Sequence, residues 1–429
     1  MITELFFLSY RVKSLTYMIF ETISCRTRWV DYKFENSLLY TTKPDLDLND
    51  ANLFDVTPTL LDLMDVDTYE TYVPLGRHVK ATRLWDRVTD AGRDATVLNV
   101  PVTFPPSSWI QRMASGFLSP DLKSAASDES LRETLDGFDY RIDVNAKPGH
   151  DDDKTEFIEN AHATLDARYE TFSHYLEQDD WDLFFGVFMS TDRVNHFLFG
   201  DYATDGEYAD EFLEFYRTLY QYIGEVRNSL DDNTTLIVAS DHGFTHLEWE
   251  VNCNQFLAEE GWLSYETADH DSLTDIDNEA RAYSLIPGRF YLNMEGRERN
   301  GVVPQSEYEA TREELIADLE SLTGPDGQQV CKRIVKGEDA FDGPHDDIAP
   351  DLVVIPANGF DLKSGFSSKE PVLTKGPRNG IHKFENSLLY TTEPGLNLRE
   401  ANLFDVTPTI LDLLDVDADA AFDGASLLG

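Results

Sequence analysis

Residues 234–244 read TTLIVASDHGF, and this stretch decides the fold class. The run at 234–240 is nearly continuous in apolar side chains, which is typical of a strand buried on both faces of a sheet. Asp241 and His242 follow it directly, and Gly243 permits a sharp turn at the strand end. Because open α/β sheets bind ligands at the carboxyl ends of their strands, these residues indicate a site at that edge.

The same alternation of strands and helices continues along the chain from residue 72. Short apolar runs predict strands, and apolar residues recurring three or four positions apart predict helices. The predicted strands are 95–100, 181–190, 234–240 and 350–356, and the predicted helices are 79–92, 153–178, 205–230, 306–322 and 403–416. This order predicts an α/β fold with a mostly parallel central sheet covered by helices on both faces. A small cap or insertion is expected at 264–345.

The charge of the chain restricts its partners. Its 429 residues include 80 Asp and Glu but only 35 Lys and Arg, which gives a net charge of −45 spread along the whole sequence. We interpret this composition as the hydrated surface of a halophilic protein, with an acidic mesophilic enzyme as the alternative. So large a negative charge repels nucleic acids and anionic membranes, so neither is expected as a partner.

The cysteines and the apolar segments favour a cytoplasmic location. Cys25, Cys253 and Cys331 are odd in number and far apart, which argues against a disulfide framework and for a reducing compartment. No apolar run is long enough for a transmembrane helix. The apolar N-terminal stretch is interrupted by Arg11 and Lys13 and lacks the order of a signal peptide.

Two further segments carry candidate metal ligands. In STDRVNHF, Asp192 and His196 are four positions apart and share one side if a helix begins there. In NGIHKFENS, we expect His382 in a glycine-preceded loop ahead of a short strand. Carboxylate oxygen and imidazole nitrogen together suit Zn²⁺, and also Mn²⁺ or Fe²⁺.

Each segment also has a simpler interpretation. The Asp–His pair is compatible with a solvated helix face, the Asp-His-Gly turn with a helix N-cap, and the last histidine with an ordinary surface or core position. A shared site is favoured because all three segments follow strand-like runs in one alternating chain.

In this order and at this spacing, TDRVNHF, SDHGF and GIH resemble the alkaline phosphatase superfamily, and within it the type I phosphodiesterase/nucleotide pyrophosphatase family. The similarity covers roughly residues 73–429 and includes ATVLNVPVTFPP, SGFLSPD, YLNMEGRERNGVV and APDLVVIP. It implies hydrolysis of a small phosphorylated substrate at a site with two divalent ions, Zn²⁺ first and Mn²⁺ as the alternative.

The resemblance also implies how the ligands are shared between the two ions. By their match to the family motifs, Asp192, His196 and His382 are expected to hold one ion. Asp241 and His242 are expected to hold the other.

The N-terminal segment departs from the family pattern. Family members open with a strand ending in an Asp ligand and then a Thr or Ser nucleophile, and we find neither in residues 1–71. Instead, residues 33–67 repeat residues 383–417, and only seven of the 35 aligned positions differ. Tyr32 stands where the C-terminal copy has the histidine. We interpret this as a duplicate that replaced the family opening, ahead of a phosphodiesterase domain at 72–429.

No catalytic nucleophile is assigned. Thr57 lies in DVTPT, but its twin Thr407 lies in the predicted closing helix, which favours a helix-start role for both. Cys25 is followed by Arg-Thr-Arg and lacks the proline of the sulfatase motif Cys-x-Pro-x-Arg. Two functions therefore stay open: a metal-dependent phosphoesterase, and a catalytically inactive member that keeps the fold and part of the metal binding.

Overall fold

The computed structural model describes most of the chain from residue 75 onward and two short N-terminal strands. The described residues are 6–11, 14–17, 75–79, 81–178, 180–298, 300–341, 349–383, 386–399, 401–417 and 422–428. The N-terminal copy at 33–67, together with Cys25 and Tyr32, lies outside the described residues.

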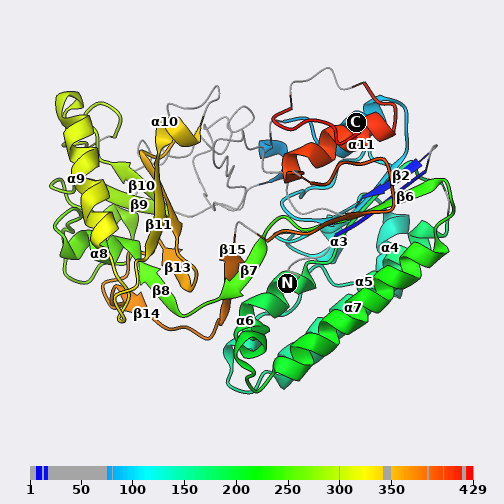
Figure 1. Cartoon of the computed structure of the whole chain (residues 1–429), viewed down its shortest axis with the longest axis horizontal. Helices are drawn as coiled ribbons and strands as arrows, with labels where there is room; N and C mark the ends of the chain where they lie inside the picture. The colour runs from blue at the N-terminus through cyan, green and yellow to red at the C-terminus, as the bar shows by residue number, and fades with distance from the viewer. Residues whose placement is uncertain are drawn as a thin grey trace.

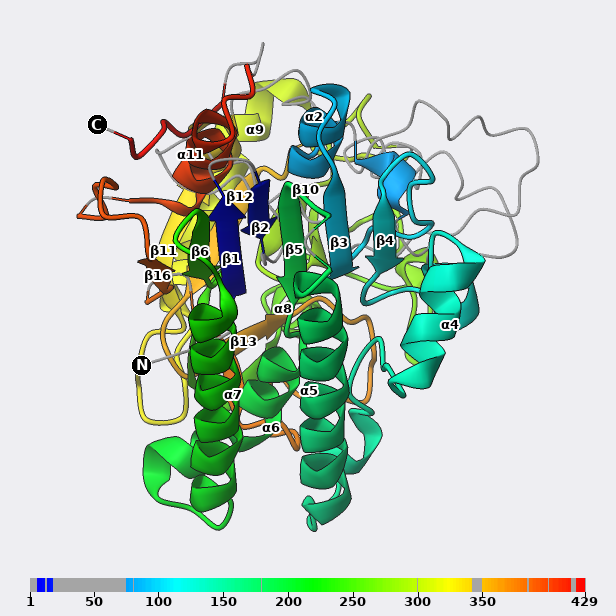
Figure 2. The same cartoon turned by 90° about the vertical axis from the view of Figure 1, so that its right-hand side faces the viewer.

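A seven-stranded sheet forms the centre of the larger of two lobes, with the strand order β16-β6-β1-β2-β5-β3-β4 (Figure 2). Its strands are β1 (Phe6–Arg11), β2 (Ser14–Tyr17), β3 (Ala95–Val100), β4 (Arg112–Ser115), β5 (Leu183–Val187), β6 (Thr234–Ala239) and β16 (Leu389–Thr391). Every residue of β3, β5 and β6 is buried, which explains why these strands are nearly continuous in apolar residues.

Helices lie on both faces of this sheet. Figure 1 shows α5 and α7 on one side and α11 on the other. The helices of this lobe are α2 (Leu84–Asp90), α3 (Leu122–Ala125), α4 (Glu129–Gly137), α5 (Thr155–Leu176), α6 (Ser190–Thr204), α7 (Ala209–Ser229) and α11 (Val406–Leu413). One hydrophobic core joins them to the sheet through residues such as Leu98, Phe172, Phe215 and Ile410.

The expectation of a mostly parallel central sheet holds only in part, because the sheet is mixed. β3 runs parallel to β4 and β5, and β2 runs parallel to β5 and β6. β1 and β16 pair antiparallel with their neighbours. Only two residues separate β1 from β2, and so short a connection permits only an antiparallel pair.

The smaller lobe has its own hydrophobic core, which runs from Val251 to Leu362. Its sheets have the orders β11-β12-β10-β9 and β13-β8-β14. The elements are β8 (Trp249–Asn252), α8 (Cys253–Glu259), β9 (Ala282–Ile286), β10 (Arg289–Leu292), α9 (Tyr308–Ser321), β11 (Cys331–Lys336), α10 (Gly337–Ala340), β12 (Leu352–Pro356), β13 (Phe360–Lys363) and β14 (Leu373–Thr374). The predicted strand at 350–356 is therefore real but belongs to an antiparallel sheet of this lobe.

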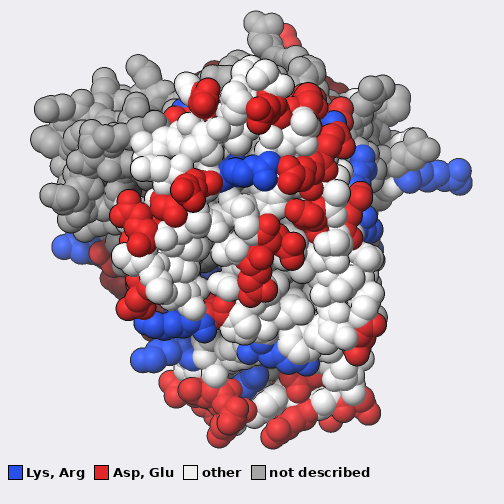
Figure 3. All heavy atoms as spheres, turned by 90° about the vertical axis from the view of Figure 1, so that its left-hand side faces the viewer, with Lys and Arg blue, Asp and Glu red and all other residues white. Residues whose placement is uncertain are grey.

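The surface of the smaller lobe carries acidic side chains across the whole face seen in Figure 3, with Lys and Arg in smaller groups between them. Among the described residues, no helix combines the length and the apolar character needed to cross a membrane. The C-terminal copy forms a short strand, β16, followed by the one-turn helix Leu403–Asp405 and α11, as its sequence predicts.

Candidate metal centre

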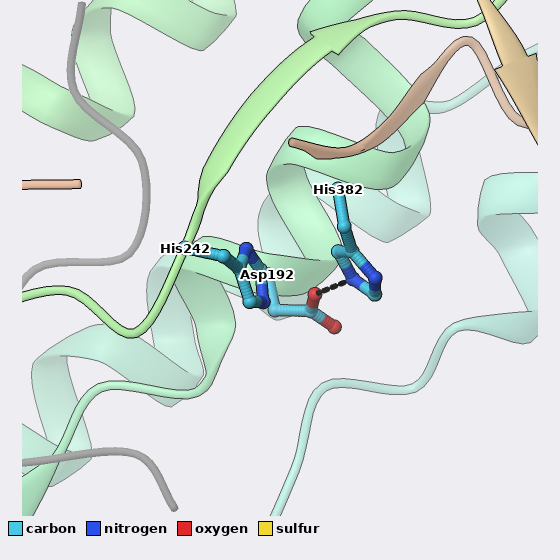
Figure 4. A group of neighbouring side chains, drawn as sticks. All are labelled: Asp192, His242 and His382. Atoms are coloured by element: carbon cyan, nitrogen blue, oxygen red, sulfur yellow. Dashed lines mark hydrogen bonds and ion pairs between the residues drawn. The ribbon is translucent and has the colours of Figure 1, made fainter. Parts of the chain in front are cut away.

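Three elements bring the predicted ligands together. Asp192 lies in the first turn of α6, and His242 lies between β6 and β7 (Gly243–His246). His382 lies within β15 (Gly380–Lys383), so the expectation of a loop position is wrong. β15 pairs antiparallel with β7, which places His382 opposite Phe244. Figure 4 shows the His242 and His382 rings approaching the Asp192 carboxylate from different elements.

The dipeptide Asn379–Gly380, which Ile381 separates from His382, attaches β15 to α6. A Cβ atom on Gly380 would lie 2.1 Å from the Asn195 carbonyl oxygen, so only glycine permits this close approach. The Asn379 N–H donates to the His196 carbonyl at 2.9 Å. The Asn379 side-chain oxygen accepts from the Gly200 N–H at 3.0 Å. These contacts fix the position of β15, and with it His382, against α6, the helix that carries Asp192 and His196.

The Asp192 carboxylate is the centre of the group. Its Oδ1 lies 3.1 Å from His382 Nε2 and 3.3 Å from His196 Nε2. Asp192 and His196 are only 4% and 7% exposed, which excludes the interpretation of this Asp–His pair as part of a solvated helix face. The His382 side chain is 49% exposed, so the group opens to solvent on that side.

Two histidines direct their Nε2 atoms at a carboxylate. His196 Nδ1 lies 3.1 Å from the carbonyl oxygen of Gly380. His242 Nδ1 lies 3.0 Å from the carbonyl oxygen of Gly243, the next residue in the chain. A carbonyl only accepts, so each Nδ1 carries a proton, and each Nε2 either carries a second proton or is left to bind a metal ion. Those Nε2 atoms face Asp192 Oδ1 and Asp241 Oδ2, each at 3.3 Å. Such a pair requires a cation between or beside it, either a proton or a metal ion.

The protonation states suit metal ligation. Burial by itself raises the pKa of Asp192, but His196, His382 and Arg193 outweigh it and hold that pKa well below its usual range. The position of Asp192 at a helix N-terminus also favours the ionised carboxylate. Burial lowers the pKa of His242, which favours the neutral imidazole. An ionised carboxylate and neutral imidazoles are the forms that bind divalent ions.

A family model described as type I phosphodiesterase/nucleotide pyrophosphatase matches residues 59–383 of the sequence, well over half of the chain. The chain belongs to the type I phosphodiesterase/nucleotide pyrophosphatase family. The matched range begins upstream of the resemblance expected from residue 73, ends directly after His382 and contains the five predicted ligands. No curated protein matches the sequence.

In this phosphodiesterase-family chain, one ligand expected for the second ion also approaches the ligands expected for the first. Within the described residues, Asp192, His242 and His382 form a group whose potential ligand atoms all lie within 4.8 Å of one another. His242 is thus adjacent to both Asp241 and the first group. The site also contains Arg193, which contacts Asp192 Oδ2 at 3.3 Å. Sequence reasoning missed it because a charged residue beside a candidate ligand carries no signal of its own.

Proposed function

We propose that this chain is a metal-dependent hydrolase of phosphate esters, of the phosphodiesterase/nucleotide pyrophosphatase type. The observation that carries the proposal is the pair of histidines whose Nε2 atoms face carboxylate oxygens at 3.3 Å, beside His382. The family match supports the reaction class. We further propose that the described sheet and helices belong to an alkaline phosphatase-like fold.

The donor set fits divalent ions. We assign Asp192, His196 and His382 to one ion and Asp241 and His242 to a second, with Zn²⁺ preferred over Mn²⁺ because imidazole nitrogens dominate. A bound ion would supply positive charge to the phosphoryl oxygens and lower the pKa of an attacking oxygen. The exposed side of His382 gives a small phosphate ester its access to the group.

A second candidate is a member that binds metal but does not turn over substrate. It is favoured by the N-terminal strands β1 and β2, which lie between β5 and β6 and read FFLSYR and SLTY. Neither strand contains the aspartate with which the family opening strand ends. Loss of one member of a catalytic unit commonly abolishes the activity of the whole unit.

Hydrolysis of bis(p-nitrophenyl) phosphate in high salt tests the two candidates. The proposal predicts turnover that a chelator abolishes and that Zn²⁺ or Mn²⁺ restores. The variant His196→Gln should reduce this turnover. His174→Gln is the control and should leave turnover unchanged, because His174 lies on α5 and makes an exposed contact with Gln178. Metal binding without turnover would favour the second candidate. If the chain neither binds metal nor turns over substrate, both candidate functions are wrong.

A further inference from the structure

A chain of contacts behind the metal centre holds the second oxygen of Asp192. While Oδ1 faces His382 and His196, Oδ2 accepts a hydrogen bond from Arg193 Nη1 at 3.3 Å. The two carboxylate oxygens therefore have different partners. A carboxylate oxygen already bound to a guanidinium is a poorer metal ligand than its free neighbour, because the cation has taken up part of its charge.

Arg193 is itself held in place. Its Nε and Nη2 donate to Asp143 Oδ2 at 3.0 and 2.6 Å, and its guanidinium carbon lies 4.7 Å from the centre of the Phe117 ring. The side chains of Arg193 and Asp143 are both 18% exposed, so the pair is largely screened from solvent. The planar fork of arginine permits contact with both carboxylates at once, which a lysine ammonium cannot reproduce.

The loop that carries Asp143 is anchored in turn. Arg168 on α5 is fully buried, and its Nη2 donates to the carbonyl oxygens of Arg141 and Ile142 at 2.5 and 2.9 Å. Asp143 Oδ1 accepts from the Val144 N–H at 2.8 Å. α5 therefore holds the loop of Asp143 from a second helix, in addition to the contact that Arg193 makes from α6.

We propose that Arg193 and Asp143 are positioning residues that leave Asp192 to bind a divalent ion through Oδ1 alone. The inference rests on the proposed function, since it concerns the same centre. Contacts outside the ligand shell commonly change metal affinity by about 10- to 100-fold. An alternative role for Arg193, direct contact with substrate, is disfavoured because its Nε, Nη1 and Nη2 all point to the two carboxylates.

Co²⁺ binding to the full chain tests this proposal, with affinity from calorimetry and coordination from the visible absorption of the ion. Arg193→Lys and Asp143→Asn should each weaken Co²⁺ binding by about 10- to 100-fold and change the visible spectrum of the bound ion. Arg83→Lys is the matched control. Arg83 pairs with Asp86 at similar exposure, 16% and 14%, and stacks on Trp85, but neither partner belongs to the metal group.

The outcomes separate this inference from the function on which it rests. If the wild-type chain binds Co²⁺ and Arg193→Lys shows the same affinity and spectrum, the positioning role is wrong and the metal centre stands. If only the KM for a phosphodiester rises in Arg193→Lys, the residue contacts substrate and the proposal is again overturned. If the wild-type chain binds no Co²⁺ at all, the proposed function fails and this inference fails with it.

Discussion

Replacing Asp192 with asparagine is expected to weaken the binding of Zn²⁺ by more than about 100-fold, since losing a ligand should cost more than the loss of an outer contact. The carboxylate is 4% exposed and interacts with His196, His382 and Arg193, so it is the anion around which the group assembles. Asparagine keeps the shape but loses the charge. Calorimetric titration with Zn²⁺ in high salt measures the change.

The control for this variant is the same substitution at the other end of the same helix. Asp205 caps α6 in a left-handed conformation with φ of 57°, which asparagine also tolerates. Asp205→Asn should bind Zn²⁺ like the wild type. Wild-type affinity in Asp192→Asn would show that the ion binds elsewhere on this acidic chain.

Gly380→Ala is expected to destabilise the protein by more than about 2 kcal/mol, because backbone atoms cannot yield as a flexible side chain can. The new Cβ atom would lie 2.1 Å from the Asn195 carbonyl oxygen and 2.8 Å from the Phe199 Cβ. To relieve the clash β15 must move away from α6, and His382 moves with it. Chemical denaturation measures the stability, and Zn²⁺ affinity should fall in the same variant.

Gly365→Ala provides the comparison, because a Cβ atom there would meet no heavy atom of the described residues within 4 Å. This variant should be close to the wild type in both stability and Zn²⁺ affinity. Equal stability of Gly380→Ala and Gly365→Ala would mean that the contact between β15 and α6 is looser than described, and that the dipeptide Asn379–Gly380 does not set the position of His382.

Much of the larger lobe could be predicted because its strands are buried on both faces. The apolar run at 95–100 coincides with β3, and the predicted helix at 153–178 contains α5. Burial on both faces leaves a continuous apolar run, and a half-buried helix leaves a periodic one, so both are visible in the sequence. The possible helix at STDRVNHF is likewise the start of α6.

Sheet membership was harder to predict, since an apolar run does not say which strands it will join. The strand at 350–356 was expected in the central sheet but forms β12 of the smaller lobe. His382 was expected in a glycine-preceded loop ahead of a short strand. Its strand, β15, exists through pairing with β7, a partner far away in sequence.

The contacts that support the candidate site depend on tertiary structure alone. Asp143 and Arg193 are 50 positions apart and lie in a loop and a helix with no shared pattern. The fit of Gly380 against Asn195 is likewise visible only once β15 lies on α6. Sequence motifs indicated the residues that bear the chemistry, whereas the contacts that orient them required the folded chain.

The most direct test of the metal centre is diffraction from crystals grown with Zn²⁺, measured on both sides of the zinc absorption edge. We predict an anomalous peak about 2.0–2.2 Å from Asp192 Oδ1 and His382 Nε2, with His196 completing the contacts. A second peak is expected beside Asp241 and His242. Zinc peaks confined to the acidic surface, with none among these five side chains, would show that the proposed metal centre is wrong.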